Sequence, residues 1–231
     1  MERCFITNKL QRNQSFFQKN TCPLVEYFHE IKWKRDETLP TILSTQEVRK
    51  IIYAMPTLQS RTFYLTLYSL GLRLREATSL QVGDILSDRG LVHIHAGKGA
   101  QDRTVPLPKI TLESLRKYYI THQNPTWIFP AMGRNGGKDS RFAQNHVSDS
   151  GVQGVLQSTA KRLEFKKHVH PHIFRYAYAT HLLEANIPIR HVQKILGHKT
   201  LKSTMIYLHV TTQAQNDSHQ RVTQVMQGVL S

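Results

Sequence analysis

The chain has 231 residues, of which 39% are hydrophobic, so it can bury a core, and wholesale disorder is excluded. Lys and Arg number 31 against 16 Asp and Glu, and the formal net charge of +15 predicts a polyanionic partner. The chain has no apolar run near the ~20 residues of a membrane span, no apolar signal sequence and only two cysteines, so we expect a cytoplasmic protein without membrane association.

Composition and pattern divide the chain into three parts. Residues 1–36 hold one short helical pattern and a charged segment that leads into Pro40. Residues 37–210 have the regular apolar spacing of a compact domain. Residues 211–231 form a tail in which VTQVMQGVL has the pattern of a short amphipathic helix.

The compact domain begins with helical patterns. Ser44 and Glu47 form a capping-box pattern ahead of apolar residues at helical spacing. The next helix is expected to stop at Gly71, and a short helix follows from Leu74 to Leu80.

The period then changes from helix to strand. LVHIHAG alternates like a strand, GKGAQDR is typical of a turn, and RTVPL is the expected return strand. Helical patterns resume with ITLESLRKYYI and, after a polar loop over residues 133–150, continue from Val152. PIRHVQKILGH should end at Gly197, and Ser203 is the expected cap of a last short element. The predicted fold is mainly α with a small antiparallel β-hairpin sheet (α+β).

Basic and nucleophilic residues collect at a few places along this domain. His172 and Arg175 are separated by about one helical turn, so their side chains share a face. Taken singly, each candidate has an ordinary explanation as a surface charge, a turn lysine, a helix-end imidazole or a core aromatic. The candidates are Arg73, Lys98, His172, Arg175, His198 and Tyr207.

Two histidine patterns could suggest a metal site. His168, His170 and His172 have strand spacing, but no cysteine or carboxylate lies near them in the sequence, so we do not predict zinc there. His93 and His95 share a strand face and are interpreted as hairpin surface. The chain also has no Walker loop and no metal-binding cluster of carboxylates, so no cofactor is expected.

The motifs are more specific in combination. GLRLRE, then GKG followed by RTVPL, then HPHIFR with ATHLLE, then LGH and YLH resemble the motifs of the tyrosine recombinase (phage integrase) family in the same order and with similar gaps. The resemblance runs from about Leu39 to His209. It implies the catalytic-domain fold of that family, and it implies that all the candidates named above belong to one active site.

The resemblance further implies a site-specific recombinase or integrase that cleaves and rejoins double-stranded DNA through a 3′-phosphotyrosyl intermediate. Two arginines can bind a phosphodiester bidentately while staying protonated. His198 would donate to the same phosphate, Tyr207 would attack it with His172 as the base, and Lys98 would protonate the departing 5′-oxygen. This chemistry needs no metal, nucleotide or small-molecule substrate.

Affinity for DNA is expected to be mostly electrostatic and sensitive to salt. The expected contacts with the DNA backbone are Arg61, Arg75, Arg103, Lys161, Arg162, Lys166, Lys167, Lys194, Lys199 and Lys202.

The chain also departs from the family pattern. Tyr176 stands where the family usually has histidine, and Arg75 replaces a small residue. Residues 1–36 are expected to be a remnant of a core-binding domain, which would leave the chain alone with weak DNA binding. Residues 211–231 would dock on a neighbouring protomer in a homo-oligomer on DNA, or fold back on their own domain.

Two other functions stay open at this point. The first is nicking and resealing like a type IB topoisomerase, without strand exchange. The second is a non-catalytic DNA-binding remnant, which the survival of every candidate position argues against.

Overall fold

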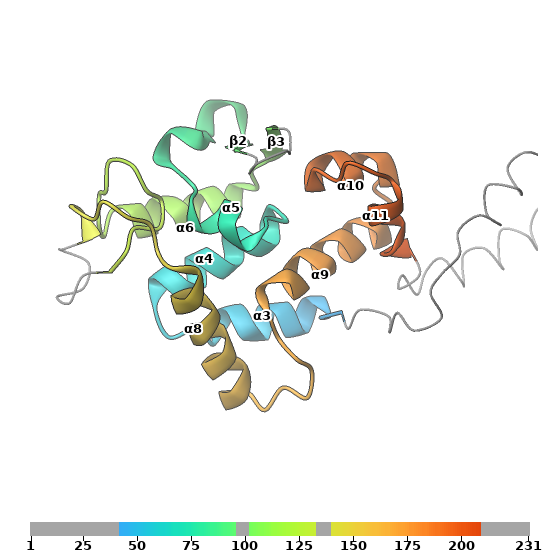
Figure 1. Ribbon diagram of the computed structural model, residues 1–231, viewed down its shortest axis with the longest axis horizontal. Helices are drawn as coiled ribbons and strands as arrows, with labels where there is room; N and C mark the ends of the chain where they lie inside the picture. Colours follow the sequence, from blue (N-terminus) through green and yellow to red (C-terminus); the bar gives the residue numbers. More distant parts are fainter. Residues whose placement is uncertain (1–41, 96–101, 133–139, 209–231) are drawn as a thin grey trace, which may run out of the picture. The chain divides into compact units, whose positions relative to one another are not determined.

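The computed structural model describes residues 42–95, 102–132 and 140–208 (Figure 1). Within these ranges no helix is long and apolar enough to cross a membrane. The predicted N-terminal segment, the turn that contains Lys98 and the C-terminal tail lie outside the described residues. The helices are α3 (Thr45–Tyr53), α4 (Leu58–Ser69), α5 (Leu74–Thr78), α6 (Lys109–Tyr119), α8 (Asp149–Arg162), α9 (Pro171–Glu184), α10 (Ile189–Leu196) and α11 (Lys202–Met205).

A small antiparallel sheet interrupts the helices, which confirms the predicted fold class. Its strands β1 (Ile85–Leu86), β2 (Leu91–Ile94) and β3 (Arg103–Pro106) pair in the order β1–β2–β3. β2 and β3 are the predicted hairpin, with Ile94 opposite Arg103. The two-residue strand β1 was not predicted, since so short a segment shows no alternation.

Most predicted helix ends are confirmed by local hydrogen bonds and backbone angles. The backbone N–H of Ser44 donates to Glu47 Oε2 at 2.8 Å, and the backbone N–H of Glu47 donates to Ser44 Oγ at 3.2 Å. Gly71 and Gly197 have φ values of 60° and 65°, the left-handed conformation that glycine adopts without strain. The prediction for Ser203 is wrong, because α11 already begins at Lys202 and Ser203 lies inside the helix.

The core is built around α4, which packs against α3, α6 and α9 (Figure 1). Phe63 and Tyr64 of α4 are fully buried, and fully burying such a side chain contributes about 1.5–3 kcal/mol. The ring of Phe63 meets that of Phe129 edge-on at 5.1 Å. The Tyr64 hydroxyl donates to the carbonyl of Val152 at 2.7 Å, so α4 also holds the start of α8.

A second, smaller apolar cluster lies between α9 and α10. It consists of Ala179, Val192, Leu196 and Tyr207, all buried. Leu196 is the last residue of α10, and Tyr207 comes just after α11. Packing in this cluster fixes the position of Tyr207 relative to α9.

The backbone at Gly71 leaves no room for a side chain. A Cβ there would lie 2.5 Å from a ring carbon of Tyr178. We expect Gly71→Ala to lower the free energy of unfolding by at least ~2 kcal/mol, since a left-handed backbone alone costs an L-residue roughly 1–2 kcal/mol. Urea denaturation followed by circular dichroism measures the change.

Gly83→Ala is the matched control, because a Cβ at Gly83 meets no atom within 4 Å. It should change the free energy of unfolding by roughly 0.5 kcal/mol or less. Equal losses in the two variants would contradict the steric account.

Candidate active site

A buried carboxylate, that of Glu76 in α5, lies among three guanidinium groups. Its Oε1 accepts hydrogen bonds from Nη1 of Arg73 at 2.8 Å and from Nη1 of Arg103 at 2.9 Å. Its Oε2 accepts from Nη2 of Arg103 at 2.8 Å, and Nη1 of Arg175 lies 3.9 Å from the same oxygen. The Glu76 side chain is only 7% exposed. One arginine from the N-cap of α5, one from β3 and one from α9 are therefore gathered around one carboxylate.

The charges in this cluster do not cancel. Burial alone would raise the pKa of Glu76, but hydrogen bonds and charge from Arg103 and Arg73 hold it at about 2. Burial and the charge of Arg73 lower the pKa of Arg175 to about 10, so Arg175 stays protonated at neutral pH. Three positive charges against one negative charge leave an excess of two, which favours a bound anion.

Arg175 is held by the ends of two helices. Its side chain is 3% exposed, with Nη1 donating to the carbonyl of Gly71 at 2.7 Å and Nη2 to the carbonyl of Leu196 at 2.5 Å. These carbonyls lie at the C-terminal ends of α4 and α10, where the helix dipole favours a cation. The guanidinium of Arg175 is thus oriented by the backbone before any ligand binds.

His198 follows directly on Gly197, at the end of α10. Its Nδ1 lies 2.9 Å from Oγ1 of Thr204, and its ring is stacked on that of Tyr207 with centroids 6.1 Å apart. Burial, reinforced by the charges of Arg175 and Arg73, lowers the pKa of His198 to about 4. The imidazole is therefore neutral at pH 7.

Tyr207 is 3% exposed and lies against this group of residues. Burial raises the pKa of its phenol above the ordinary value of 10, while Arg175 lowers it through its charge and a side-chain hydrogen bond. The ring of Tyr176 packs 5.8 Å from that of Tyr207, centroid to centroid. The phenol is protonated at neutral pH, so nucleophilic attack by it requires a base.

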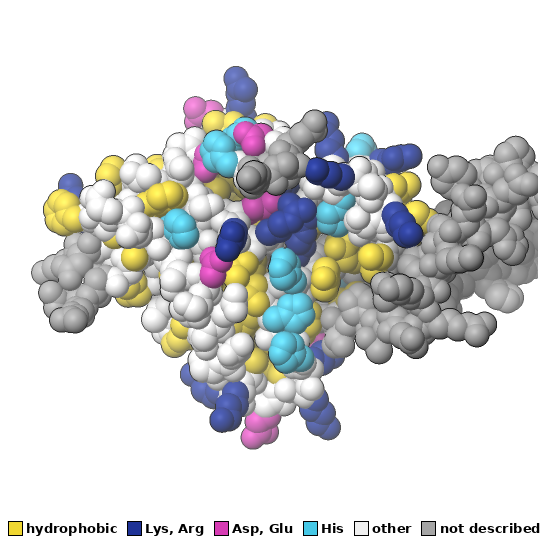
Figure 2. All heavy atoms as spheres, viewed as in Figure 1, with side chains coloured by type: hydrophobic (Ala, Val, Ile, Leu, Met, Phe, Trp, Pro, Cys, Tyr) yellow, Lys and Arg dark blue, Asp and Glu magenta, His cyan; other side chains and the backbone are white. Residues whose placement is uncertain are grey.

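His172 lies in the first turn of α9, after Pro171 at the first helical position. Desolvation, followed by the charges of Arg175 and Arg73, lowers the pKa of His172 below 6.5. Its imidazole is thus neutral at pH 7 and able to accept a proton. Figure 2 shows a vertical row of histidine side chains directly below a group of Lys and Arg side chains near the middle of the view.

The structure brings together all the predicted catalytic positions that it describes, namely Arg73, His172, Arg175, His198 and Tyr207. Lys98 lies outside the described residues. Sequence reasoning missed Glu76, because a glutamate in the first turn of a helix is ordinarily a capping residue. Its pairing with Arg103, 27 residues away, is a tertiary contact that no local pattern reveals.

Most of the predicted DNA contacts have exposed side chains. Lys167 is half-buried instead, and its Nζ lies 2.6 Å from Glu47 Oε2. The exposed ones are Arg61, Arg75, Lys161, Arg162, Lys166, Lys194, Lys199 and Lys202.

Two of these exposed arginines also hold the C-terminal end of α3. Arg61 donates to the carbonyl of Tyr53 at 3.3 Å, and Arg162 donates to the carbonyl of Ala54. Basic groups commonly satisfy the free carbonyls at a helix C-terminus. These two arginines therefore have a structural role whether or not they contact DNA.

Arg103 was predicted to contact DNA at the surface, but the structure shows its side chain buried. Its side chain is 8% exposed, and besides Glu76 it binds the carbonyl of Ile195 at 2.8 Å through Nε. A Cβ at Gly197 would lie 2.9 Å from Arg103 Cδ, so the glycine leaves room for the arginine to pass. The structure places Arg103 inside the site, where it joins β3 to the end of α10.

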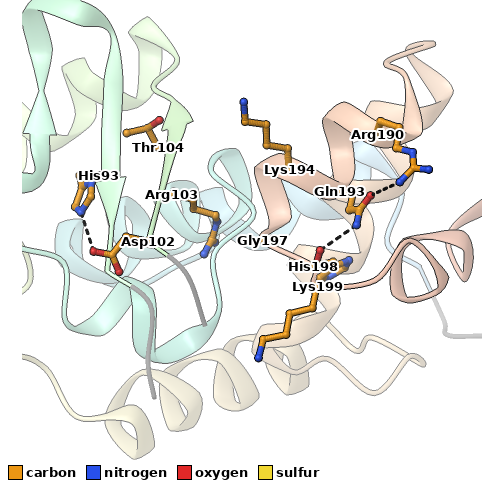
Figure 3. A pocket seen from close by; sticks show the side chains of 10 residues that line it. All are labelled: His93, Asp102, Arg103, Thr104, Arg190, Gln193, Lys194, Gly197, His198 and Lys199. Atoms are coloured by element: carbon orange, nitrogen blue, oxygen red, sulfur yellow. Dashed lines mark hydrogen bonds and ion pairs between the residues drawn. The ribbon is translucent and has the colours of Figure 1, made fainter. Parts of the chain in front are cut away.

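A cavity of about 830 Å³ lies between the strand pair and α10 (Figure 3). Lys194, His198 and Lys199 lie on its helix side, and Arg103 lies on its strand side. Arg190, an exposed cation that sequence analysis did not select, also lines it. The cavity therefore continues the positive surface outward from His198.

Comparison with known proteins shows the family of the chain. Residues 41–214 match the Phage integrase family. The chain belongs to that family. The tyrosine recombinase XerA of Thermococcus onnurineus is 35% identical over 182 residues, which make up 78% of this chain and 62% of the relative.

Two solved structures show the same fold. A crystal structure of XerA recombinase matches with a TM-score of 0.66 and 24% identity, over 80% of this chain and 65% of that one. A lambda integrase dimer bound to a COC′ core site matches with a TM-score of 0.60 and 19% identity, over 75% of this chain and 49% of that one. The chain thus spans less than two thirds of the length of these relatives.

The charge state of Glu76 should govern the acid stability of the protein. Its pKa is 4.5 ordinarily and about 2 in the fold, so its ionisation stabilises the folded state above pH 4.5 and stops doing so as the pH falls through 2. That stabilisation is roughly 3 kcal/mol. Glu76→Gln should lower the stability at neutral pH and flatten its decline between pH 4.5 and 2, as measured by urea denaturation across this range.

Glu113→Gln, at an exposed position of α6, is the control and should keep the decline of the unmodified protein. The same slope in Glu76→Gln as in the unmodified protein would show that Glu76 does not carry this dependence.

Proposed function

We propose that the chain is a site-specific recombinase or integrase that cleaves and rejoins double-stranded DNA through a 3′-phosphotyrosyl intermediate. The observation that carries the proposal is the convergence of Tyr207 with Arg73, Arg175 and His198 around an excess of positive charge. Membership of the phage integrase family supports it, since the XerA relative is named a tyrosine recombinase.

The arginines would bind the scissile phosphate. Arg175 is preoriented by two carbonyls, and Arg73 keeps a 40% exposed side chain while bound to Glu76. Guanidinium groups stay charged and match the oxygens of a phosphodiester in bidentate geometry. Preorganised donors of this kind are worth about 3–4 kcal/mol each in other enzymes.

The Tyr207 oxygen would attack phosphorus as the phenol proton passes to His172. The bond from phosphorus to the 5′-oxygen then breaks, and that oxygen takes a proton from Lys98, the role that the family resemblance implies. The Thr204 hydroxyl would donate a hydrogen bond to His198 Nδ1. The neutral imidazole then carries its proton on Nε2, which can donate a hydrogen bond to the phosphate. Attack by a 5′-hydroxyl on the phosphotyrosine reverses these steps and rejoins the strand, without a metal or cofactor.

Assembly on DNA belongs to the same proposal. The lambda integrase structure is a dimer bound to DNA, which supports a homo-oligomer on DNA here. We still predict that residues 211–231 dock on a neighbouring protomer and that residues 1–36 derive from a core-binding domain. We also still predict a cytoplasmic location.

Removal of the Tyr207 hydroxyl should abolish the covalent intermediate. Full-length chain is incubated with a pool of DNA duplexes of random sequence, each of which carries a nick. The covalent protein–DNA adducts that survive denaturing electrophoresis are then counted. The unmodified chain should form an adduct, and Tyr207→Phe should reduce it to background, because phenylalanine has no oxygen to attack phosphorus.

Tyr176→Phe is the matched control, since Tyr176 packs on Tyr207 and should keep adduct formation. Adduct formation by Tyr207→Phe would overturn the assignment. Relaxation of supercoiled plasmid without recombinant products would favour the topoisomerase-like function. No adduct with any DNA would favour a binding remnant.

The lysines on the helix side of the cavity should carry part of the DNA affinity. Lys194 and Lys199 are exposed beside His198, so a double substitution to alanine should reduce the slope of log affinity against log salt by roughly 2, close to one unit per lost phosphate contact. Fluorescence anisotropy with a labelled duplex measures the slope.

Lys117→Ala, at an exposed position of α6, is the control and should leave the salt slope unchanged. A double variant with the salt slope of the unmodified chain would remove these lysines from the DNA interface.

A further inference from the structure

We propose that His93, His95 and Asp102 form a binding site for a divalent transition-metal ion such as Zn²⁺ at the end of the β2–β3 strand pair. His93 and His95 are two residues apart around the end of β2, and such spacing places side chains on one face of a strand. Asp102 comes directly before β3, opposite His95 if the pairing of Ile94 with Arg103 is continued. The ligand atoms of the three residues lie within 4.8 Å of one another.

The distances fit a single metal centre after small side-chain movements. Asp102 Oδ2 lies 3.3 Å from His93 Nε2 and 3.7 Å from His95 Nδ1. In a tetrahedral zinc site with bonds of 2.0–2.1 Å, neighbouring ligand atoms are roughly 3.3 Å apart. The two imidazole rings are inclined at 74°, so they do not stack flat on each other and can direct nitrogens to a common point.

His95 is held by a buried carboxylate, which an ordinary histidine–aspartate pair at a protein surface does not have. Asp84 is 7% exposed, and its Oδ1 lies 2.7 Å from His95 Nε2. Asp84 Oδ2 accepts the backbone N–H of Gln81 at 2.9 Å, which fixes the orientation of the carboxylate. Donation of Nε2–H to Asp84 leaves a lone pair on His95 Nδ1 that faces the oxygen of Asp102. A cation between the two would bind the nitrogen and the oxygen together, as in the carboxylate–histidine–metal arrangement of many zinc sites.

The ligand set defines the class of ion. Two imidazoles and one carboxylate suit Zn²⁺, Co²⁺ or Ni²⁺, whereas Mg²⁺ and Ca²⁺ prefer oxygen ligands alone. His95 and Asp102 have 57% and 55% exposed side chains, so water can complete the coordination and the ion can exchange. The histidines were predicted to lie on the hairpin surface, and the sequence did not indicate that Asp84 lies behind His95.

The position of the site gives it a structural role distinct from the phosphate chemistry. His93 and Asp102 lie on the strand side of the cavity, across from Lys194 and Lys199 (Figure 3). Asp102 is adjacent in sequence to Arg103, which binds Glu76. An ion held here would join the two strand ends that flank residues 96–101 and stabilise the strand that carries Arg103.

Metal titration of the full-length chain tests this proposal. Chain freed of metal with EDTA is titrated with Co²⁺ and followed by visible absorption, and Zn²⁺ is then added as a competitor. One equivalent should bind with the spectrum of nitrogen- and oxygen-ligated Co²⁺. His93→Ala should weaken binding at least 10-fold, and Asp84→Asn should weaken it about 10- to 100-fold, as loss of a carboxylate behind a ligating histidine commonly does.

A His168→Ala and His191→Ala double variant is the control, because both histidines are exposed elsewhere in the fold. It should keep the Co²⁺ affinity and a Zn²⁺-dependent rise in melting temperature that His93→Ala loses. Because Asp84 is buried, Asp84→Asn is compared only if circular dichroism shows that it is folded. If it is unfolded, His93→Ala decides alone, since His93 is only half-buried.

The proposal is overturned if the unmodified chain binds no more Co²⁺ than His93→Ala, or if the control variant loses the binding. Neither result bears on Tyr207, because the covalent adduct is measured without added metal.

Discussion

The contact between the Glu76 carboxylate and three arginines is the interaction on which the rest of the site depends. Arg73, Arg103 and Arg175 come from different elements, and like charges this close repel by several kcal/mol in the partly buried environment of a site. A buried carboxylate is itself unstable without such partners, and breaking a buried pair by removing one member commonly costs about 3–5 kcal/mol. Each side therefore stabilises the other, and the surplus positive charge remains for a ligand.

Backbone carbonyls also fix the orientation of two of these arginines. Arg175 takes its orientation from carbonyls at the ends of α4 and α10, and Arg103 binds a carbonyl in the last turn of α10. Both helices end in left-handed glycines, and a side chain at either glycine would collide with a neighbour. His198 and Tyr207 follow α10 in the chain, so the same anchoring sets their distance from the arginines. In the proposed reaction, the Tyr207 phenol stays protonated in its buried position until His172 takes the proton.

Local signals in the sequence predicted the elements that depend on local physics. The capping box at Ser44, the glycine at Gly71 and the alternation in β2 each depend on a few neighbouring residues, and each is confirmed. Family motifs predicted the site positions that the structure brings together. The sequence did not reveal the partner of Arg103, which was expected on the surface, because burial of one arginine among ten basic candidates depends on a contact with Glu76 far along the chain. The pairing of Asp84 with His95 was not predicted either, because it joins residues on two different segments of the fold.

A structure of the chain bound to a DNA duplex would test the central claim most directly. One phosphate should accept hydrogen bonds from Arg73, Arg175 and His198 at once, with the Tyr207 oxygen in line with the bond to the departing 5′-oxygen and Glu76 still paired to the arginines. Phosphates distributed over separate surfaces, or a Tyr207 hydroxyl directed away from the bound phosphate, would contradict the account.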